Sequence, residues 1–175
     1  GAARTSTAPQ LSLASCAALE VDGRVAEIEA ARRFHRETRT LLVVGAERFA
    51  RIAFDEAGLY RRMRGNSSCA AGTGSFLDQQ ATRLGLAGGS PDLAARAVQN
   101  RGDYPAIASR CSVFAKTDLI HAQAEGWSVE GICEGLCHGL ARNIADTLFP
   151  GERPDAPIFM AGGVSRNAAV VRHLS

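Results

Sequence analysis

The chain has 175 residues, enough for one domain with a hydrophobic core, and 46% of them are apolar. A total of 20 Lys and Arg residues against 18 Asp and Glu residues gives a net charge of +2, too balanced to predict binding to nucleic acid or to a membrane surface. No apolar run approaches the roughly 20 residues of a membrane span. The five cysteines, an odd number, favour reduced thiols or metal ligands over a disulfide framework. We therefore expect a cytoplasmic protein.

The first third of the chain predicts a lead-in, a helix and a β-meander. Residues 1–15 are rich in Ala, Ser, Thr and Pro without a sustained period, which indicates a mobile segment. The chain starts at Gly1 and stops soon after a glycine turn, so we expect a fragment of a longer protein. A short helix is predicted over residues 25–34. Three strands in antiparallel order should follow, at 41–44, 51–54 and 59–64.

The remainder predicts helices and one last strand. The helices are expected at 74–84, 93–100, 112–125 and 129–148. The last of them carries apolar residues at three- and four-residue steps, which should face the sheet, and Ser128 is its expected N-cap. A buried strand at 157–160 leads into the turn Ala161-Gly162-Gly163 and another helix.

A cysteine lies beside a glycine turn in the segment Asn66-Ser67-Ser68-Cys69-Ala70-Ala71-Gly72-Thr73-Gly74. The helix that begins here should direct its unpaired N–H groups toward whatever Cys69 holds. Cys111 repeats the arrangement at the start of the helix over 112–125. A helix dipole lowers the pKa of a thiol and favours the thiolate that binds iron, although a small buried hydrophobe is the usual fate of a free cysteine.

Two thiolates cannot complete the four-cysteine shell of an iron–sulfur cluster, but a two-fold dimer with one cluster on its axis can. Cys133, Cys137 and His138 are a weaker candidate site. Three residues separate these cysteines, whereas haem attachment needs two, and core packing is the better interpretation of both; zinc is the minor alternative. His35, His121 and His173 are isolated, which favours surface or polar core positions.

Glycine turns at Gly45, at Gly72-Thr73-Gly74 and at Gly162-Gly163 each stand between elements that a nucleotide-binding site uses. None has the full spacing of a dinucleotide fingerprint, and no phosphate-loop pattern with Lys before Ser or Thr occurs. Taken singly, the turns at Gly72-Thr73-Gly74 and at Gly162-Gly163 are each better explained as an ordinary strand-to-helix connection. Their recurrence makes a nucleotide site a serious hypothesis.

Four motifs in the same order resemble those of one family: Cys69-Ala70-Ala71-Gly72-Thr73-Gly74-Ser75-Phe76-Leu77, Arg110-Cys111-Ser112-Val113-Phe114-Ala115, Gly135-Leu136-Cys137 through Arg142-Asn143, and Ala161-Gly162-Gly163-Val164-Ser165-Arg166-Asn167. The family is the BadF/BadG/BcrA/BcrD type of ATPase, the CoA-substrate-specific enzyme activators. It includes activators of 2-hydroxyacyl-CoA dehydratases and ATPase subunits of benzoyl-CoA reductase. The resemblance runs from about Glu27 to Val171.

The resemblance implies an α/β fold of the actin-like type (ribonuclease H-like, as in sugar kinases and Hsp70), a mixed sheet with helices. Residues 25–175 would be its second lobe, and residues 1–24 a lead-in or a remnant of a first lobe that is largely missing. It also implies a homodimer with one [4Fe–4S] cluster held by Cys69 and Cys111 of each subunit, ATP or ADP with Mg²⁺, and transfer of one low-potential electron to a dehydratase or reductase acting on an acyl-CoA.

By the same resemblance, the nucleotide site would be formed by Gly45, Ala46, Gly72, Thr73, Gly74, Gly162, Gly163 and Asn167. One departure concerns hydrolysis. Where the family has Asp-Ile-Gly-Gly-Gln-Asp, this chain has Val43-Val44-Gly45-Ala46-Glu47-Arg48, so both aspartates that would place Mg²⁺ and water are missing. Glu47 is a weak substitute, one position out of register. A non-redox, catalytically degenerate binding or dimerisation module is the alternative function, and a small-molecule kinase is disfavoured.

Overall fold

The computed structural model describes residues 2–5, 18–66, 73–108 and 112–175. Its centre is a four-stranded mixed sheet in the order β5-β4-β3-β6. The strands are β3 (Thr40–Val44), β4 (Phe49–Phe54), β5 (Tyr60–Gly65) and β6 (Ile158–Ala161). The predicted antiparallel meander is confirmed for β3, β4 and β5, while β6 returns from the far end of the chain to pair with β3 in parallel.

The two faces of the sheet belong to two separate cores, because successive strand residues point to opposite sides. Leu41 and Val43 pack with Ile52 and Phe54 on the face that α1 (Gly23–Phe34) covers. Leu42, Val44 and Phe49 on the other face join the larger core of the helices. The helix α1 begins where Asp22 caps it, since the Asp22 carboxylate accepts a hydrogen bond from the Arg24 amide at 2.8 Å.

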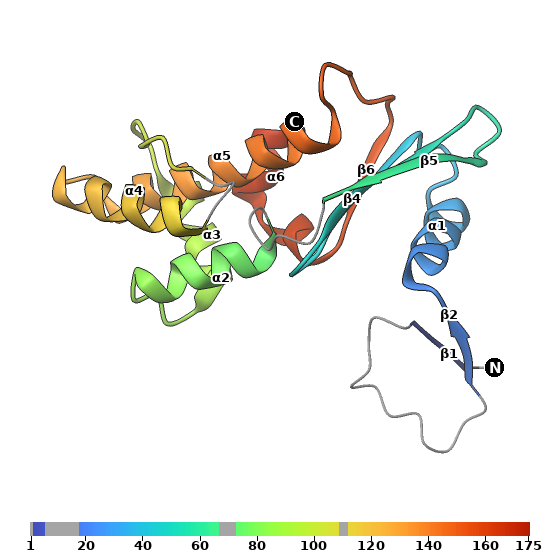
Figure 1. Ribbon diagram of the computed structural model, residues 1–175, viewed down its shortest axis with the longest axis horizontal. Coiled ribbons are helices and arrows are strands. Elements are labelled where there is room, and N and C mark those ends of the chain that lie inside the picture. The colour runs from blue at the N-terminus through green and yellow to red at the C-terminus, as the bar shows by residue number, and fades with distance from the viewer. Residues whose placement is uncertain (1, 6–17, 67–72, 109–111) are drawn as a thin grey trace.

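The other helices gather at one end of the sheet (Figure 1). They are α2 (Gly74–Arg83), α3 (Gly89–Gln99), α4 (Ser112–Ala124), α5 (Val129–Leu148) and α6 (Ala168–Leu174), the last preceded by the 3-10 turn η1 (Gly163–Arg166). All four helices predicted between residues 74 and 148 are confirmed. Only α3 differs notably, since it starts at Gly89, four residues before the predicted start.

The long helix α5 forms the centre of the helical core. The predicted cap is confirmed, because the Ser128 hydroxyl accepts a hydrogen bond from the Gly131 amide at 3.0 Å. The apolar stripe of α5 is buried, but the expectation that it faces the sheet was wrong for most of its length. It packs chiefly on α3 and α6, and only its C-terminal end reaches β4 and β5. Because helices rather than the sheet cover α5, the core extends well beyond the sheet.

Part of the stretch predicted as a lead-in has regular structure. The strands β1 (Ala2–Thr5) and β2 (Ala18–Val21) form a separate parallel pair, with Ala2 opposite Ala18. The division of the chain at residues 24 and 25 stays a prediction. In the parts of the chain that the structure describes, no helix combines the length and apolarity needed to cross a membrane.

Candidate functional site

Three turns from distant parts of the chain meet beside the end of β3. The first is the hairpin that joins β3 to β4, closed by a hydrogen bond from the Gly45 amide to the Arg48 carbonyl at 2.8 Å. The second is the start of α2 at Gly74, and the third is the turn at Gly162 that connects β6 to η1. The structure therefore brings together turns that lie up to 117 positions apart in the chain, from 45 to 162.

The amino end of α2 is fastened directly to the hairpin. The Gly74 amide donates to the Gly45 carbonyl at 2.9 Å, and the Ser75 amide donates to the Ala46 carbonyl at 2.8 Å. These are two of the N–H groups expected to point toward a ligand of Cys69. That expectation was wrong for both, because the hairpin carbonyls accept their hydrogen bonds.

Gly162 allows the third turn to approach β3. Its φ of 92° lies in the left-handed region, and a side chain at this position would collide with the Val44 backbone. Gly74 is nearly as confined, since a Cβ there would lie 3.2 Å from the Gly45 carbonyl oxygen. Close contact between backbones explains why glycines occur in these turns.

A cavity of about 860 Å³ opens beside the three turns. This volume is within the range of about 300–1,000 Å³ typical of small-molecule sites. One wall carries the turns and the other is the outer face of α3. The lining is mostly small and apolar, with Asp78 and Arg166 as its charged residues. It consists of Gly45, Ala46, Gly74, Leu77, Asp78, Ser90, Pro91, Ala94, Ala95, Val98, Gln99, Gly163, Val164, Arg166, Asn167 and Ala168.

Five of the residues predicted for a nucleotide site line this cavity, namely Gly45, Ala46, Gly74, Gly163 and Asn167. Gly162 supports the turn from outside the lining, and Thr73 is fully buried as the residue before α2. Glu47 is exposed and also outside the lining. Gly72, Cys69 and Cys111 lie outside the described residues.

Asn167 holds the turn in shape. Its Oδ1 accepts a hydrogen bond from the Val170 amide at 3.1 Å and so caps α6, while its Nδ2 lies 3.6 Å from Cys137 Sγ. The residue is buried at 7% exposure. Its side-chain amide therefore has partners within the protein, which indicates a structural role at the edge of the cavity.

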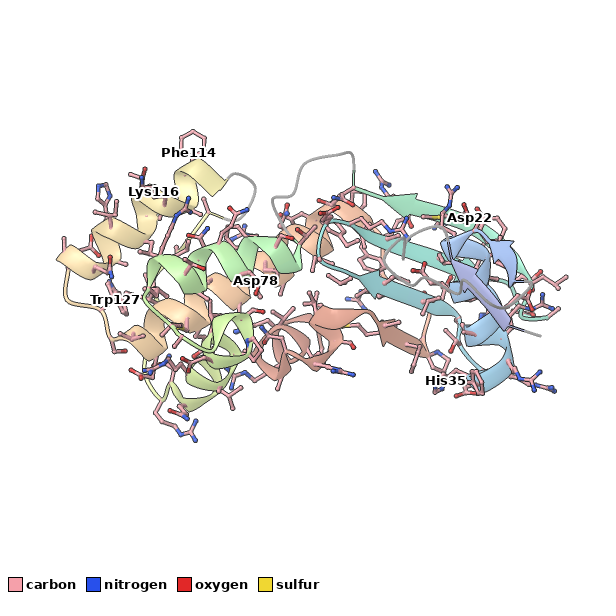
Figure 2. All side chains as sticks on the ribbon, turned by 90° about the horizontal axis from the view of Figure 1, so that it is seen from below. Asp22, His35, Asp78, Phe114, Lys116 and Trp127 are labelled. Carbon is pink, nitrogen blue, oxygen red and sulfur yellow. The ribbon has the colours of Figure 1, made fainter. Side chains whose placement is uncertain are left out.

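The wall formed by α3 was missed in the sequence. Pro91, Ala94, Ala95 and Val98 recur at three- and four-residue steps on the side of the helix away from the buried Leu93 and Ala97. A second apolar face on one helix is the signal that was available. Asp78 on α2, labelled in Figure 2, lies in the lining beside the start of α3, where its carboxylate accepts a hydrogen bond from the Ser90 amide at 3.3 Å.

The core interpretation of Cys133 and Cys137 is confirmed. Both side chains are fully buried within the apolar core. Burial raises the pKa of each thiol to about 12, so both stay protonated and are poor metal ligands. Among the residues that the structure describes, no three His, Cys, Asp or Glu side chains come together as a metal site requires.

A polar cluster lies between α3, α5 and α6. The buried Glu134 accepts hydrogen bonds from Asn100 at 2.7 Å and from Arg172 at 2.6 Å. The His173 ring lies 5.1 Å from that of His138 and 5.6 Å from that of Tyr104. The sequence analysis described His173 as isolated, and this was wrong, because its ring lies beside those of His138 and Tyr104. Its partner His138 is 35 positions away, and only the packing of α6 on α5 joins them.

This cluster predicts a loss of stability in mild acid. Burial, and then the neighbouring His138, lower the pKa of His173 below its ordinary value of 6.5. The unfolded chain therefore binds a proton more readily, and the free energy of unfolding should fall as the pH drops below about 6.5. Denaturant titrations at pH 7.5 and 5.5 measure this change. The variant His173→Gln should show a smaller dependence, whereas His121→Gln, on an exposed site of α4, should keep that of the parent. Equal dependence in all three would contradict the assignment.

Solved structures share this architecture. The activator of 2-hydroxyisocaproyl-CoA dehydratase from Clostridium difficile, with bound ADPNP, matches with a TM-score of 0.80 and 24% identity over 91% of this chain and 58% of that one. The component A of (R)-2-hydroxyglutaryl-CoA dehydratase from Acidaminococcus fermentans matches with a TM-score of 0.78 and 25% identity over 89% of this chain and 58% of that one. The fold is that of an actin-like ATPase activator, an α/β structure with a mixed sheet.

Within this class the family is also shown. Residues 18–175 match the BadF/BadG/BcrA/BcrD ATPase family, and the chain belongs to it. The activator of lactoyl-CoA dehydratase from Anaerotignum propionicum is 31% identical over 77% of this chain and 50% of the relative. One of the subunits of benzoyl-CoA reductase from Thauera aromatica is 29% identical over 79% of this chain and 48% of the relative. The chain spans about half the length of these relatives.

Proposed function

We propose that this chain is the cluster-bearing part of an ATP-dependent activator that passes one low-potential electron to an enzyme acting on an acyl-CoA. The observation that supports this most is the cavity, where Gly45, Ala46, Gly74 and Gly163 line one wall and the apolar face of α3 lines the other. Its size suits a nucleotide, and relatives of the chain are named as activators of CoA dehydratases. The enzyme partner would be a 2-hydroxyacyl-CoA dehydratase or a benzoyl-CoA reductase.

The proposed chemistry places a nucleotide in the cavity and iron at the cysteines. Cys69 and Cys111 from each of two subunits would hold one [4Fe–4S] cluster, which supplies one-electron transfer. For a one-electron couple, about 59 mV corresponds to a tenfold change in equilibrium, so part of the free energy of nucleotide binding can raise the reducing power of the electron. The chain's own part is to bind the nucleotide and to hold the hairpin and α2 together beside it.

The nucleotide proposal predicts that a bulky side chain in the wall abolishes binding. The variant Ala94→Phe should lower the affinity for ADP by at least tenfold, since the ring would occupy the cavity, without a loss of secondary structure. Isothermal titration with Mg-ADP measures the affinity. Ala124→Phe is the matched control, because Ala124 is an exposed helical alanine on α4 outside the cavity. Undiminished affinity for ADP in Ala94→Phe would contradict the proposal that the nucleotide binds in this cavity.

The cluster proposal predicts iron in anaerobically purified protein. We expect a brown dimer that absorbs at about 400 nm and contains about four irons per two chains. Iron analysis together with light scattering measures both quantities. Protein that remains colourless and monomeric after anaerobic reconstitution with iron and sulfide would contradict the proposal.

One observation favours the non-redox alternative, a nucleotide-binding or dimerisation module without catalysis. The hairpin at Gly45 lacks both family aspartates, and Glu47 is exposed outside the cavity lining. Since Mg²⁺ prefers carboxylate ligands, this hairpin has little to hold the metal for hydrolysis. ADP binding by protein that cannot be loaded with iron would select this alternative.

A further inference from the structure

A second hollow, of about 190 Å³, lies where the C-terminal end of α5 meets β4 and β5. Its lining is Arg51, Arg62, Met63, Arg64 and Glu152, and it shares no residue with the lining of the nucleotide cavity. The strand β5 is an edge of the sheet, and all six of its residues are exposed. Solvent and ions therefore have access to this hollow.

Arg51 is buried and held in a fixed position in this hollow. It is only 4% exposed. Its guanidinium lies 4.6 Å from the centre of the Phe149 ring and donates hydrogen bonds to the Leu148 carbonyl at 3.4 Å and to Glu152 at 2.9 Å. Its Nε is also buried and has no hydrogen-bond partner among the described residues. Arg51 is thus a preorganised cation of the hollow, and its Nε makes no hydrogen bond with the described residues.

The positive charges of the hollow exceed its negative charge. Glu152 is the one carboxylate of the lining, and it pairs with Arg51 at 2.9 Å and with Arg62 at 2.6 Å. Arg64 lies opposite Arg51 across the two strands and makes no ion pair with any residue that the structure describes. Three guanidinium groups and one carboxylate leave two positive charges unbalanced.

The support of α5 explains only part of this arrangement. A cation near the last carbonyls of a helix is stabilising, which accounts for Arg51, and Glu152 then orients Arg51 and Arg62. This role uses neither Arg64 nor the Nε of Arg51. Guanidinium groups recognise phosphate with several hydrogen bonds at once, and a dianion matches the unbalanced charge.

We propose that this hollow is a binding site for a phosphate-type dianion. When no anion is bound, Glu152 forms ion pairs with Arg51 and Arg62 in its place. The volume is below the roughly 300 Å³ at which small-molecule pockets begin, so a single phosphate group fits and a whole nucleotide does not. The ligand is either free inorganic phosphate or a phosphate group esterified to a larger molecule. The proposal does not depend on the function proposed above.

The test is a titration of the ¹⁵N-labelled protein with inorganic phosphate, observed by NMR at the backbone amides of Met63 and Arg64 and at the Nε of Arg51. We expect saturable shifts there with phosphate and none with acetate at equal ionic strength. Glycerol 3-phosphate separates the two ligand sources, because shifts with it indicate access for esterified phosphate, and shifts with inorganic phosphate alone indicate a site for the free ion.

Three variants determine whether the arginines bind the anion. Arg64→Ala should weaken phosphate binding about tenfold or more, because it removes a charge-assisted contact. Arg61→Ala is the matched control, with the same charge change on the same strand outside the hollow, and should bind as the parent does. Glu152→Gln should bind phosphate several-fold more tightly, since it removes the internal competitor. Equal effects of Arg64→Ala and Arg61→Ala, or weaker binding by Glu152→Gln, would overturn the proposal.

Discussion

Replacing Gly162 with alanine is expected to destabilise the protein by about 3 kcal/mol or more. The φ of 92° at this residue disfavours any L side chain, and a Cβ would collide with the Val44 carbonyl. The position of the alanine Cβ is fixed by the backbone, and the atoms that it meets are backbone atoms of Val44, so no side-chain rotation relieves the collision. The turn would have to leave β3 and take η1 and α6 with it. Urea denaturation followed by circular dichroism measures the change.

Gly163→Ala is the matched control for that measurement. A Cβ at Gly163 would have no neighbour within 4 Å, and the residue opens η1 without a left-handed backbone. We expect its free energy of unfolding to stay within about 0.5 kcal/mol of the parent, as for most surface substitutions. Equal stability of the two alanine variants would contradict the close approach of Gly162 to Val44.

The second large effect concerns the proposed iron ligands. Cys69→Ser and Cys111→Ser should each abolish iron binding after anaerobic reconstitution, because a four-thiolate shell built from two subunits loses two ligands with each substitution. Iron content and absorbance at about 400 nm measure the loss.

The control for the iron ligands is Cys133→Ala, a fully buried core position. This variant should retain its iron even though the smaller side chain costs some stability. Loss of iron in Cys133→Ala together with retention in Cys69→Ser would reverse the assignment of ligands.

The sequence predicted most of the elements because their signals are local. The helix α5 was predicted with its observed bounds, since Ser128 caps its start and Pro150-Gly151 follows its end. The meander followed from short apolar runs separated by turn residues. The start of α3 at Gly89 was missed, because a glycine and a proline in its first turn resemble a loop.

The sites were predicted less completely, because they depend on which elements become neighbours. The glycine turns were recognised one at a time, whereas the apolar face of α3 became a cavity wall only when α3 and the turns were placed opposite each other. The pairing of His138 with His173 and the grouping of Arg51 with Arg64 depend on helix packing and strand register. A local pattern does not encode these contacts.

The two hydrogen bonds between the hairpin and α2 have a mechanical consequence. The amides of Gly74 and Ser75 grip the carbonyls of Gly45 and Ala46, and sliding one backbone past the other would break both bonds at a cost of about 1–3 kcal/mol in total. A motion that does not supply this free energy leaves both bonds intact, so the hairpin and the first turn of α2 move together. A displacement of Gly45 and Ala46 in the cavity lining would therefore also displace the backbone at Gly74, because the hydrogen bonds that join them involve only main-chain atoms.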